Sequence, residues 1–376
     1  MSDSRRVYRA IKRTVMQAYP QKPEGHLERR LNTLAFMVSG IVLGKHCQLP
    51  KIASETPGDI HPASREKQLY RWLKNEHVGW EVHFLPFVQP LLVALAAVRP
   101  LVFIMDGSTV ARGCVTLMVS LIFAKRALPI AWLVIHGVKG HFPAETHVKL
   151  IQHVHALVPA DTPVTFLGDG EFDSPELQAT VNGYGWQYVC RTAKNIQIQV
   201  GGAWCSLVDL KVQRGQREFR KQVLFTNQAY GPVMVIAWWD ARYPDPIYLV
   251  SNLRSVQAAC DCYRKRAHTP APPAEQVRVE TFFSDQKSRG FQLAKSHVSD
   301  PARVMRLMLA TCLAYLWVLY LGTVAHQEDW TRRIHRQHRC DLSLFQLGLR
   351  LLDHLLKNDL ALPNSFCLEP EPECVR

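Results

Sequence analysis

Two aspartates each follow a short apolar run, and carboxylates placed in this way can do chemistry on phosphate esters. Asp106 follows the apolar residues 101–105, and Asp169 follows the mostly apolar residues 164–168. Phosphodiester transfer uses two divalent ions about 3.5–4 Å apart, one for the attacking oxygen and one for the leaving oxygen. Mg²⁺ (or Mn²⁺) suits hard oxygen ligands and needs only a few carboxylates. A single aspartate after a strand is more often a turn residue or a helix cap. A metal site is therefore predicted only if a third acid joins the two aspartates.

The third acid is predicted at Glu280. Lys287 follows it by seven residues, so on one helix the two side chains would share a face, offset by about 20°. Phe282, Phe283 and Phe291 can pack that helix onto a sheet. By their spacing alone, Glu280 and Lys287 are more readily explained as an ordinary pair on a helix surface than as catalytic residues.

Alternation of apolar runs and helical periodicity predicts the elements that must position these acids. Strands are expected at 101–106, 115–123, 128–136, 164–167 and 187–190, and helices at 146–157 and 174–182. The order β-β-β-α-β-α-β matches an RNase H-like core. The first and fourth strands of such a core are neighbours, so their acids can converge.

More strands are expected after this core, at 196–200, 207–212, 218–225, 234–238 and 247–250, which indicates a β-rich insertion. A helix is expected from 281 to 295. The first hundred residues have helical periodicity, with a turn at Pro57 and a basic helix after Ser64. This arrangement fits a helix-turn-helix-like DNA reader and, equally, a helical cap with a solvated basic face. The candidate DNA-end contacts are Arg65, Lys67, Arg71 and Lys74.

The chain carries 45 Lys and Arg against 32 Asp and Glu among 376 residues, a formal charge of +13, which favours nucleic acid as a partner. None of the ten cysteines forms a CxxC pair, so a reducing cytosol is expected rather than a disulfide framework. No signal peptide is expected. The apolar stretch 304–325 has the length of a membrane span, but Arg306 within it favours a buried core helix, and no membrane partner is expected.

The block Tyr263-Arg264-Lys265-Arg266, followed by Glu280 and Lys287, resembles the Y-x2-R-x3-E-x6-K signature of DDE transposases of the fourth insertion-sequence family. The resemblance extends over roughly 103–322 and is strongest at 279–290. It implies an RNase H-like catalytic core with a β-rich insertion before the last acid. It also implies that Asp106, Asp169 and Glu280 are the three catalytic acids and hold two Mg²⁺ or Mn²⁺ ions.

The same resemblance implies further contacts with DNA. The positions expected to bind backbone phosphates of the element's end are Arg191, Tyr263, Arg266 and Lys287. Members that cut through a DNA hairpin stack an extruded base on an aromatic side chain in the last strand of the insertion. The candidates for that role are Tyr248, Trp238 and Trp239, although a tryptophan in a strand is more often simply packed.

The spacing departs from the signature in one place. Glu280 lies fourteen positions after Arg266 where the signature has a spacing of four, and removal of 268–277 restores the pattern. Three prolines in that segment forbid a continuous helix. Either the segment loops out and the helix resumes near Arg278, or Tyr263 and Arg266 have left the site.

Together these features predict an α/β protein in five parts: a helical DNA-binding region (1–98), an RNase H-like core (99–194 and 257–300) interrupted by the β-rich insertion (195–256), and a C-terminal helical region with an acidic tail (301–376). The expected function is cut-and-paste transposition of an insertion sequence in the bacterial cytoplasm, at the nucleoid. The expected partners are double-stranded DNA, as terminal inverted repeats and target, and a second copy of the chain. The alternatives are a decayed or repurposed DNA-binding protein and a nuclease for RNA hybrids.

Overall fold

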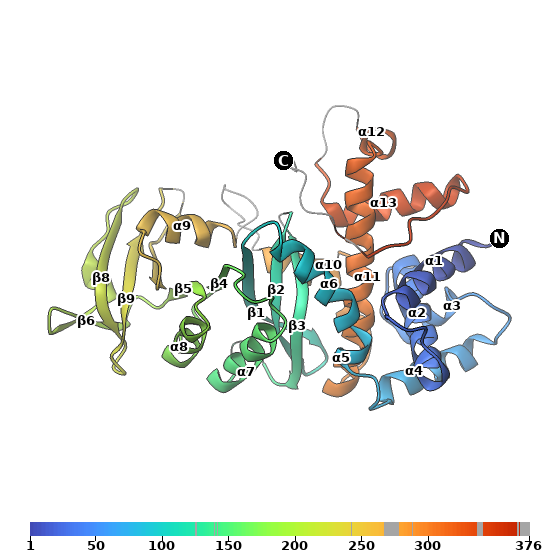
Figure 1. Ribbon diagram of the computed structural model, residues 1–376, viewed down its shortest axis with the longest axis horizontal. Helices are drawn as coiled ribbons and strands as arrows, with labels where there is room; N and C mark the ends of the chain where they lie inside the picture. Colours follow the sequence, from blue (N-terminus) through green and yellow to red (C-terminus); the bar gives the residue numbers. More distant parts are fainter. Residues whose placement is uncertain are drawn as a thin grey trace.

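The computed structural model (Figure 1) describes residues 1–124, 126–138, 140, 142–241, 243–266, 278–287, 289–336, 341–366 and 368. For residues 278–280 it describes the backbone only. The predicted acidic tail and the whole proline-containing segment 268–277 therefore lie outside the described residues.

A three-stranded antiparallel meander forms the centre of the molecule. It consists of β1 (Leu101–Ala111), β2 (Cys114–Phe123) and β3 (Arg126–His136). Gly113 makes the β1–β2 turn at φ +68°, a conformation that side chains with a Cβ rarely adopt. β2 is buried along its whole length. β1 and β3 pair with its two edges, and α7 contacts it.

Two parallel strands extend this meander on the β1 side. These are β4 (Val164–Gly168) and β5 (Gln187–Thr192), and each is preceded by a helix, α7 (Ala144–His155) or α8 (Pro175–Gly183). Ser174 caps α8 by accepting a hydrogen bond from the Leu177 N–H at 3.3 Å. The resulting order β3-β2-β1-β4-β5 is the RNase H-like arrangement that the sequence predicts, so the fold prediction is confirmed.

The β-rich insertion continues the same sheet. Its elements are β6 (Gln197–Val200), β7 (Ala203–Ser206), η1 (Leu207–Leu210), β8 (Arg217–Phe225), β9 (Tyr230–Trp238) and β10 (Ile247–Ser251). β10 pairs antiparallel with β5, so the described residues form one ten-stranded sheet in the order β3-β2-β1-β4-β5-β10-β9-β8-β6-β7. The strand expected at 207–212 is wrong: Ser206 and Asp209 form a capping box that starts a 3₁₀ turn there instead.

The chain returns to the core through α9 (Val256–Arg264) and α10 (Arg278–Gln286). The helix expected to run through residue 295 ends at Gln286, and a separate 3₁₀ turn, η2 (Leu293–Lys295), follows. The Phe291 N–H donates to the Asp285 carbonyl at 2.9 Å and folds the chain back on itself. Gly290 permits this turn, because a Cβ there would overlap the same carbonyl.

A helical layer lies at the other end of the molecule from the insertion (Figure 1). Its N-terminal part consists of α1 (Asp3–Gln17), α2 (Gly25–Gly44), α3 (Leu49–Ser54), α4 (Pro62–Lys74), α5 (Trp80–His83) and α6 (Leu85–Ala96). Its C-terminal part consists of α11 (Pro301–Gln327), α12 (Thr331–Ile334) and α13 (Leu344–Lys357). Both parts share one core around α11, which contacts α2, α4, α13 and β3.

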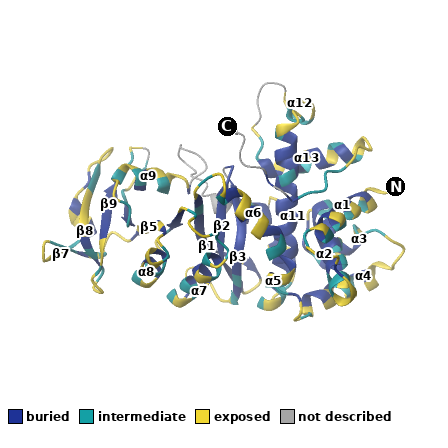
Figure 2. Cartoon of the chain, in the orientation of Figure 1, coloured by how far each residue is buried: buried dark blue, intermediate teal, exposed yellow. Residues whose placement is uncertain are grey.

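Helix α11 is long and apolar enough to cross a membrane, but 94% of its most apolar window is buried inside the protein. Figure 2 shows it as a dark-blue column between the sheet and the N-terminal helices α1 to α4. Arg306, in the second turn of α11, donates to the Leu73 carbonyl at 2.9 Å and so holds α11 against the end of α4. The prediction of a buried core helix agrees with this packing.

Candidate active site

Asp106 lies within β1, not at its end as the sequence suggests. The strand continues to Ala111 because residues beyond Asp106 pair with β2. The side chain is 3% exposed, and its Oδ1 accepts a hydrogen bond from the Gly107 N–H at 2.8 Å. A buried carboxylate is costly without compensating donors or cations, so Asp106 marks a place where the fold accommodates negative charge.

Asp169 is the residue directly after β4, and it lies beside Asp106. The parallel register pairs Ile104 with Leu167, so two residues further on Asp106 and Asp169 reach the same level of the two strands. The Asp169 Oδ1 accepts from the Glu171 N–H at 3.0 Å, which fixes the turn after β4. The predicted convergence of the first two acids is therefore present in the fold.

Glu280 belongs to α10, and the structure describes its backbone but not its side chain. Lys287, the residue directly after α10, reaches the same sheet: its Nζ donates to the Ser108 Oγ at 2.6 Å. Ser108 lies on β1 two residues beyond Asp106. The end of α10 is thus attached to β1 close to the two aspartates.

A buried ion pair attaches α10 to the sheet. The Arg126 Nη1, at the start of β3, lies 3.0 Å from the Asp285 Oδ2, and both side chains are buried. Burial raises the pKa of Asp285 to about 6, against the opposing charges of Arg126 and Arg289. Phe282 and Phe283 are also buried, as expected for the apolar face of this helix.

Tyr263 and Arg266 remain at the site despite the inserted segment. α9 ends at Arg264 and α10 begins at Arg278, so the two helices are separate. The Arg266 Nη2 lies 3.6 Å from the Asp169 Oδ2, and its Nη1 donates to the Tyr263 hydroxyl at 3.2 Å. Of the two alternatives left by the sequence, the structure has the one in which these residues stay beside the acids.

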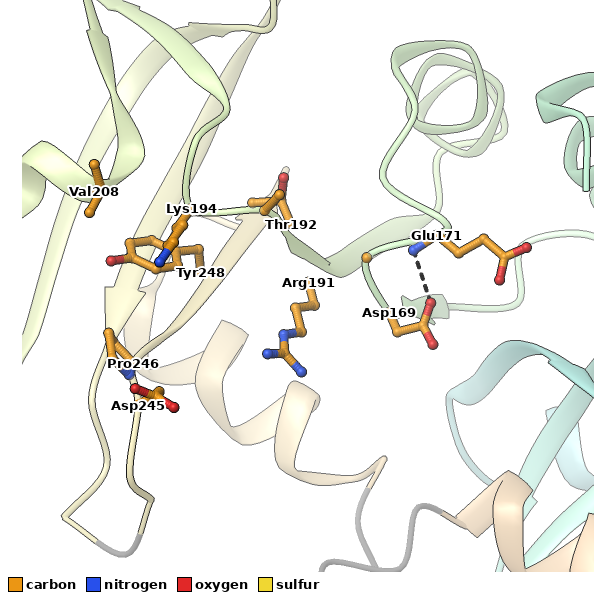
Figure 3. Close-up of a pocket in the computed structure, with 11 residues that line it drawn as sticks. Asp169, Glu171, Arg191, Thr192, Lys194, Val208, Asp245, Pro246 and Tyr248 are labelled. Atoms are coloured by element: carbon orange, nitrogen blue, oxygen red, sulfur yellow. Dashed lines mark hydrogen bonds between the residues drawn. The ribbon is translucent and has the colours of Figure 1, made fainter. Parts of the chain in front are cut away.

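A cavity of about 770 Å³ opens beside Asp169 between the core and the insertion (Figure 3). Its lining includes two cations, Arg191 on β5 and Lys194 just after it, and the ring of Tyr248 on β10. In Figure 3 the Arg191 guanidinium lies between Tyr248 and Asp169. The remaining lining residues are Gly170, Glu171, Thr192, Ala193, Val208, Asp245 and Pro246.

The other two stacking candidates do not line this cavity. Trp238 is buried, with the guanidinium carbons of Arg217 and Arg264 at 5.4 and 4.7 Å from its ring. Trp239 donates from its Nε1 to the Tyr243 carbonyl at 3.1 Å. Of the three aromatic residues suggested by the sequence, Tyr248 is therefore the one that lines the cavity.

Comparison with known families decides the assignment. Residues 100–317, more than half of the chain, match the family described as the transposase DDE domain. The chain belongs to this family. The matched part begins just before β1 and ends within α11, so this transposase domain includes the insertion as well as the five core strands. No protein with curated annotation matches the chain.

Two solved structures resemble the transposase at low identity. One is a cryo-EM structure of the piggyBac transposase synaptic complex with hairpin DNA, with 12% identity and a TM-score of 0.41, covering 95% of this chain and 80% of that one. The other is a crystal structure of human ENDOV, with 16% identity and a TM-score of 0.29, covering 50% and 84%.

The donor set of this transposase fits a hard divalent cation. Asp106 and Asp169 offer carboxylate oxygens from neighbouring strands, the ligand type that Mg²⁺ and Mn²⁺ prefer. Burial by itself disfavours a charged Arg266, yet Tyr263, Asp169 and Asp106 together raise its pKa, so the site stabilises positive charge. Among the described residues no three His, Cys, Asp or Glu side chains could hold an ion together.

Sequence reasoning missed His147, which lies next to this site. The residue is on α7, 2% exposed, and its ring packs edge-on against Phe172 with centroids 4.9 Å apart. Neither ring nitrogen has a hydrogen-bond partner among the described residues. Burial lowers the pKa of His147 to about 4, against the opposing charge of Asp169. One histidine in an amphipathic helix gave no signal that could have marked it.

The burial of His147 predicts a pH dependence of stability. Because the folded state lowers its pKa from 6.5 to about 4, the stabilisation from the neutral ring is complete above about pH 6.5 and is lost as the pH falls toward 4. We expect this group to contribute on the order of 2 kcal/mol to that loss. Urea unfolding of wild type and His147→Phe across this range measures it, and the variant should show a shallower acid loss. Parallel profiles would contradict the prediction.

The N-terminal candidates separate into two kinds. Lys67, Arg71 and Lys74 are exposed on α4, and spacings of four and three residues place them on one helix face. Arg65 is buried: it donates to the Pro57 carbonyl at 3.2 Å, and its guanidinium lies 4.0 Å from the Phe36 ring centroid. The suggested contact of Arg65 with DNA is therefore corrected, because this side chain holds α4 against α2.

Proposed function

We propose that this transposase moves an insertion sequence by a cut-and-paste reaction. The observation that carries the proposal is the placement of Asp106 and Asp169 at one level of two neighbouring strands, with cationic side chains beside them. Hydrolysis at the end of the element would free a 3′-OH. The same site would then direct that 3′-OH at the opposite strand, to form a hairpin, or at target DNA.

The reaction would use two Mg²⁺ or Mn²⁺ ions, which activate the attacking oxygen and stabilise the leaving oxygen when bound. Asp106 and Asp169 would hold them, and Glu280 would complete the ligand set from α10. The Lys287–Ser108 hydrogen bond and the Arg126–Asp285 ion pair would keep α10 against the strands that carry the aspartates.

Cations around the aspartates would bind the phosphates of the cleaved strand. Arg191 and Lys194 line the cavity next to Asp169, and Lys287 lies beside β1. Tyr263 and Arg266 would add contacts from the end of α9. These interactions do not depend on base sequence and should weaken as salt rises.

The cavity beside Asp169 would receive one unpaired nucleotide. Its volume of about 770 Å³ falls within the range of small-molecule sites. Tyr248 would stack on the base while Arg191 and Lys194 neutralise its phosphate. Val208 and Pro246 supply further apolar lining.

This role of Tyr248 predicts a specific binding defect. Because base stacking on an aromatic ring contributes about 1–3 kcal/mol, Tyr248→Ala should weaken binding of hairpin-ended DNA by roughly 10- to 100-fold. Tyr248→Phe keeps the ring and should bind normally. Affinities for hairpin-ended and blunt duplexes, measured by fluorescence anisotropy, test this. An equal loss for both duplexes in Tyr248→Ala would contradict a stacking role.

Selection of the correct DNA end would come from the N-terminal helices, through Lys67, Arg71 and Lys74. Two ends must be paired before cutting, so the active form would be a homodimer bound to both terminal repeats.

A plasmid carrying this coding region with its flanking DNA tests the proposed function. Full-length protein should cut at inverted repeats bracketing the gene in Mg²⁺ and not in EDTA. Specific binding of those repeats without cutting would instead support a repurposed DNA-binding protein. Cutting of RNA–DNA hybrids regardless of end sequence would support a nuclease.

A further inference from the structure

Arg266 is buried, which is unusual for a residue that is expected to bind DNA phosphates. It lies two residues past the end of α9, and its Nη2 is 3.6 Å from the Asp169 Oδ2. Asp106 also acts on it electrostatically. In the described structure this guanidinium is therefore drawn toward both predicted metal-binding aspartates.

The contact is looser than a permanent salt bridge. Arginine and carboxylate groups that form a stable pair usually meet through two parallel hydrogen bonds of about 2.7–2.9 Å. Here the separation is 3.6 Å, and the buried Nε has no hydrogen-bond partner among the described residues. By contrast, the buried pair of Arg126 and Asp285 in the same protein closes to 3.0 Å. Arg266 thus compensates the aspartates without being fixed to them.

Two neighbouring carboxylates need positive charge close by, whichever group supplies it. A guanidinium and a divalent cation would compete for this position, because each is stabilised by the same negative charge. The phosphates of DNA are negatively charged, as the aspartates are, and their geometry matches that of a guanidinium. They therefore offer Arg266 a second binding partner. The residue can therefore neutralise either the acids or the DNA.

We propose that Arg266 is an internal counter-ion that neutralises Asp106 and Asp169 until DNA and metal arrive together. DNA phosphates draw the guanidinium away from the aspartates, and divalent ions then bind there more tightly. Binding of metal and binding of DNA are thereby coupled, each favouring the other by the same factor. This inference rests on the proposed metal-dependent function.

Mn²⁺ titration by isothermal calorimetry tests the coupling, with full-length wild type, Arg266→Gln and Asp106→Asn. Without DNA, Arg266→Gln should bind Mn²⁺ about tenfold more tightly than wild type, a typical size for such coupling. A 30-base-pair duplex should tighten Mn²⁺ binding to wild type and change it much less in Arg266→Gln. Arg266→Lys, which keeps the charge, should resemble wild type.

Arg264→Gln is the matched control. Arg264 lies at the end of the same helix, 2.8 Å from Asp261 and 3.8 Å from Asp240, so its loss should leave Mn²⁺ affinity unchanged. Equal or weaker Mn²⁺ binding by Arg266→Gln would overturn the inference while leaving the metal site itself intact. Mn²⁺ binding that Asp106→Asn does not reduce, or no binding by wild type, would instead overturn the proposed function and the inference with it. The melting temperature without metal gives a second readout: it should be lower in Arg266→Gln, and Mn²⁺ should raise it more than in wild type.

Discussion

Asp106→Asn is expected to reduce DNA strand cleavage by on the order of a thousandfold. The substitution removes one charged ligand of the proposed ions, whose stabilisation of transition-state charge contributes several kcal/mol. The Asp106 Oδ1 accepts a hydrogen bond of 2.8 Å from the Gly107 N–H. The Oδ1 of an asparagine can accept the same hydrogen bond. The fold should therefore remain intact. Cleavage rates on end-containing DNA in Mg²⁺ measure the effect.

Asp161→Asn is a matched control for this experiment. Asp161 is exposed in the loop before β4 at φ +58°, and asparagine tolerates that conformation as well as aspartate does. The control should cleave and bind duplex DNA as wild type does, and both variants should remain folded. Normal cleavage by Asp106→Asn would remove Asp106 from the chemistry.

Gly348→Ala is expected to destabilise the protein by about 3 kcal/mol or more. A Cβ at Gly348 would overlap the carbonyl oxygen of Val318, and one at Gly322 would overlap that of Leu344. These are backbone atoms of α11 and α13, so relief requires the two helices to separate along a buried contact. Thermal unfolding should show the melting temperature fall by roughly 4 °C or more.

Gly183→Ala is the comparison that isolates this close approach. Gly183 is also helical, but nothing lies within 4 Å of a Cβ built there. Alanine should be neutral or stabilise the protein by up to about 1 kcal/mol. If Gly348→Ala melted no earlier than Gly183→Ala, the tight α11–α13 crossing would be wrong.

Much of the core could be predicted because its signals are local. Apolar runs predicted β1 to β5 in the right order, and the parallel pairing of β1 with β4 follows from that order. Ser174 was recognised as the cap of α8 from its residue type and position alone. Asp106 and Asp169 were found because each follows an apolar run.

The errors arose where distant contacts override local preference. Arg65 was expected on the surface, yet Phe36 and the Pro57 carbonyl bury it. The helix expected to continue beyond Gln286 stops because Gly290 and Phe291 fold the chain back onto Asp285. The type of a residue and its neighbours in the sequence do not reveal such partners, because they come from distant parts of the chain or from a turn.

The site shows the same division. The spacing of Tyr263 and Arg266 from Glu280 left their place undecided, and contacts between separate helices and strands settle it. Choosing Tyr248 over Trp238 required the guanidinium groups that cover Trp238, which come from β8 and α9. Lys194 and His147 gained significance only when the fold placed them next to Asp169.

An anomalous difference map from crystals grown in Mn²⁺ would locate the bound ions. We expect density between Asp106 and Asp169 within about 2.2 Å of their carboxylate oxygens, with Glu280 reaching the same ions and Arg266 displaced from Asp169. Mn²⁺ density elsewhere, with Glu280 turned away and Arg266 still against Asp169, would contradict this expectation.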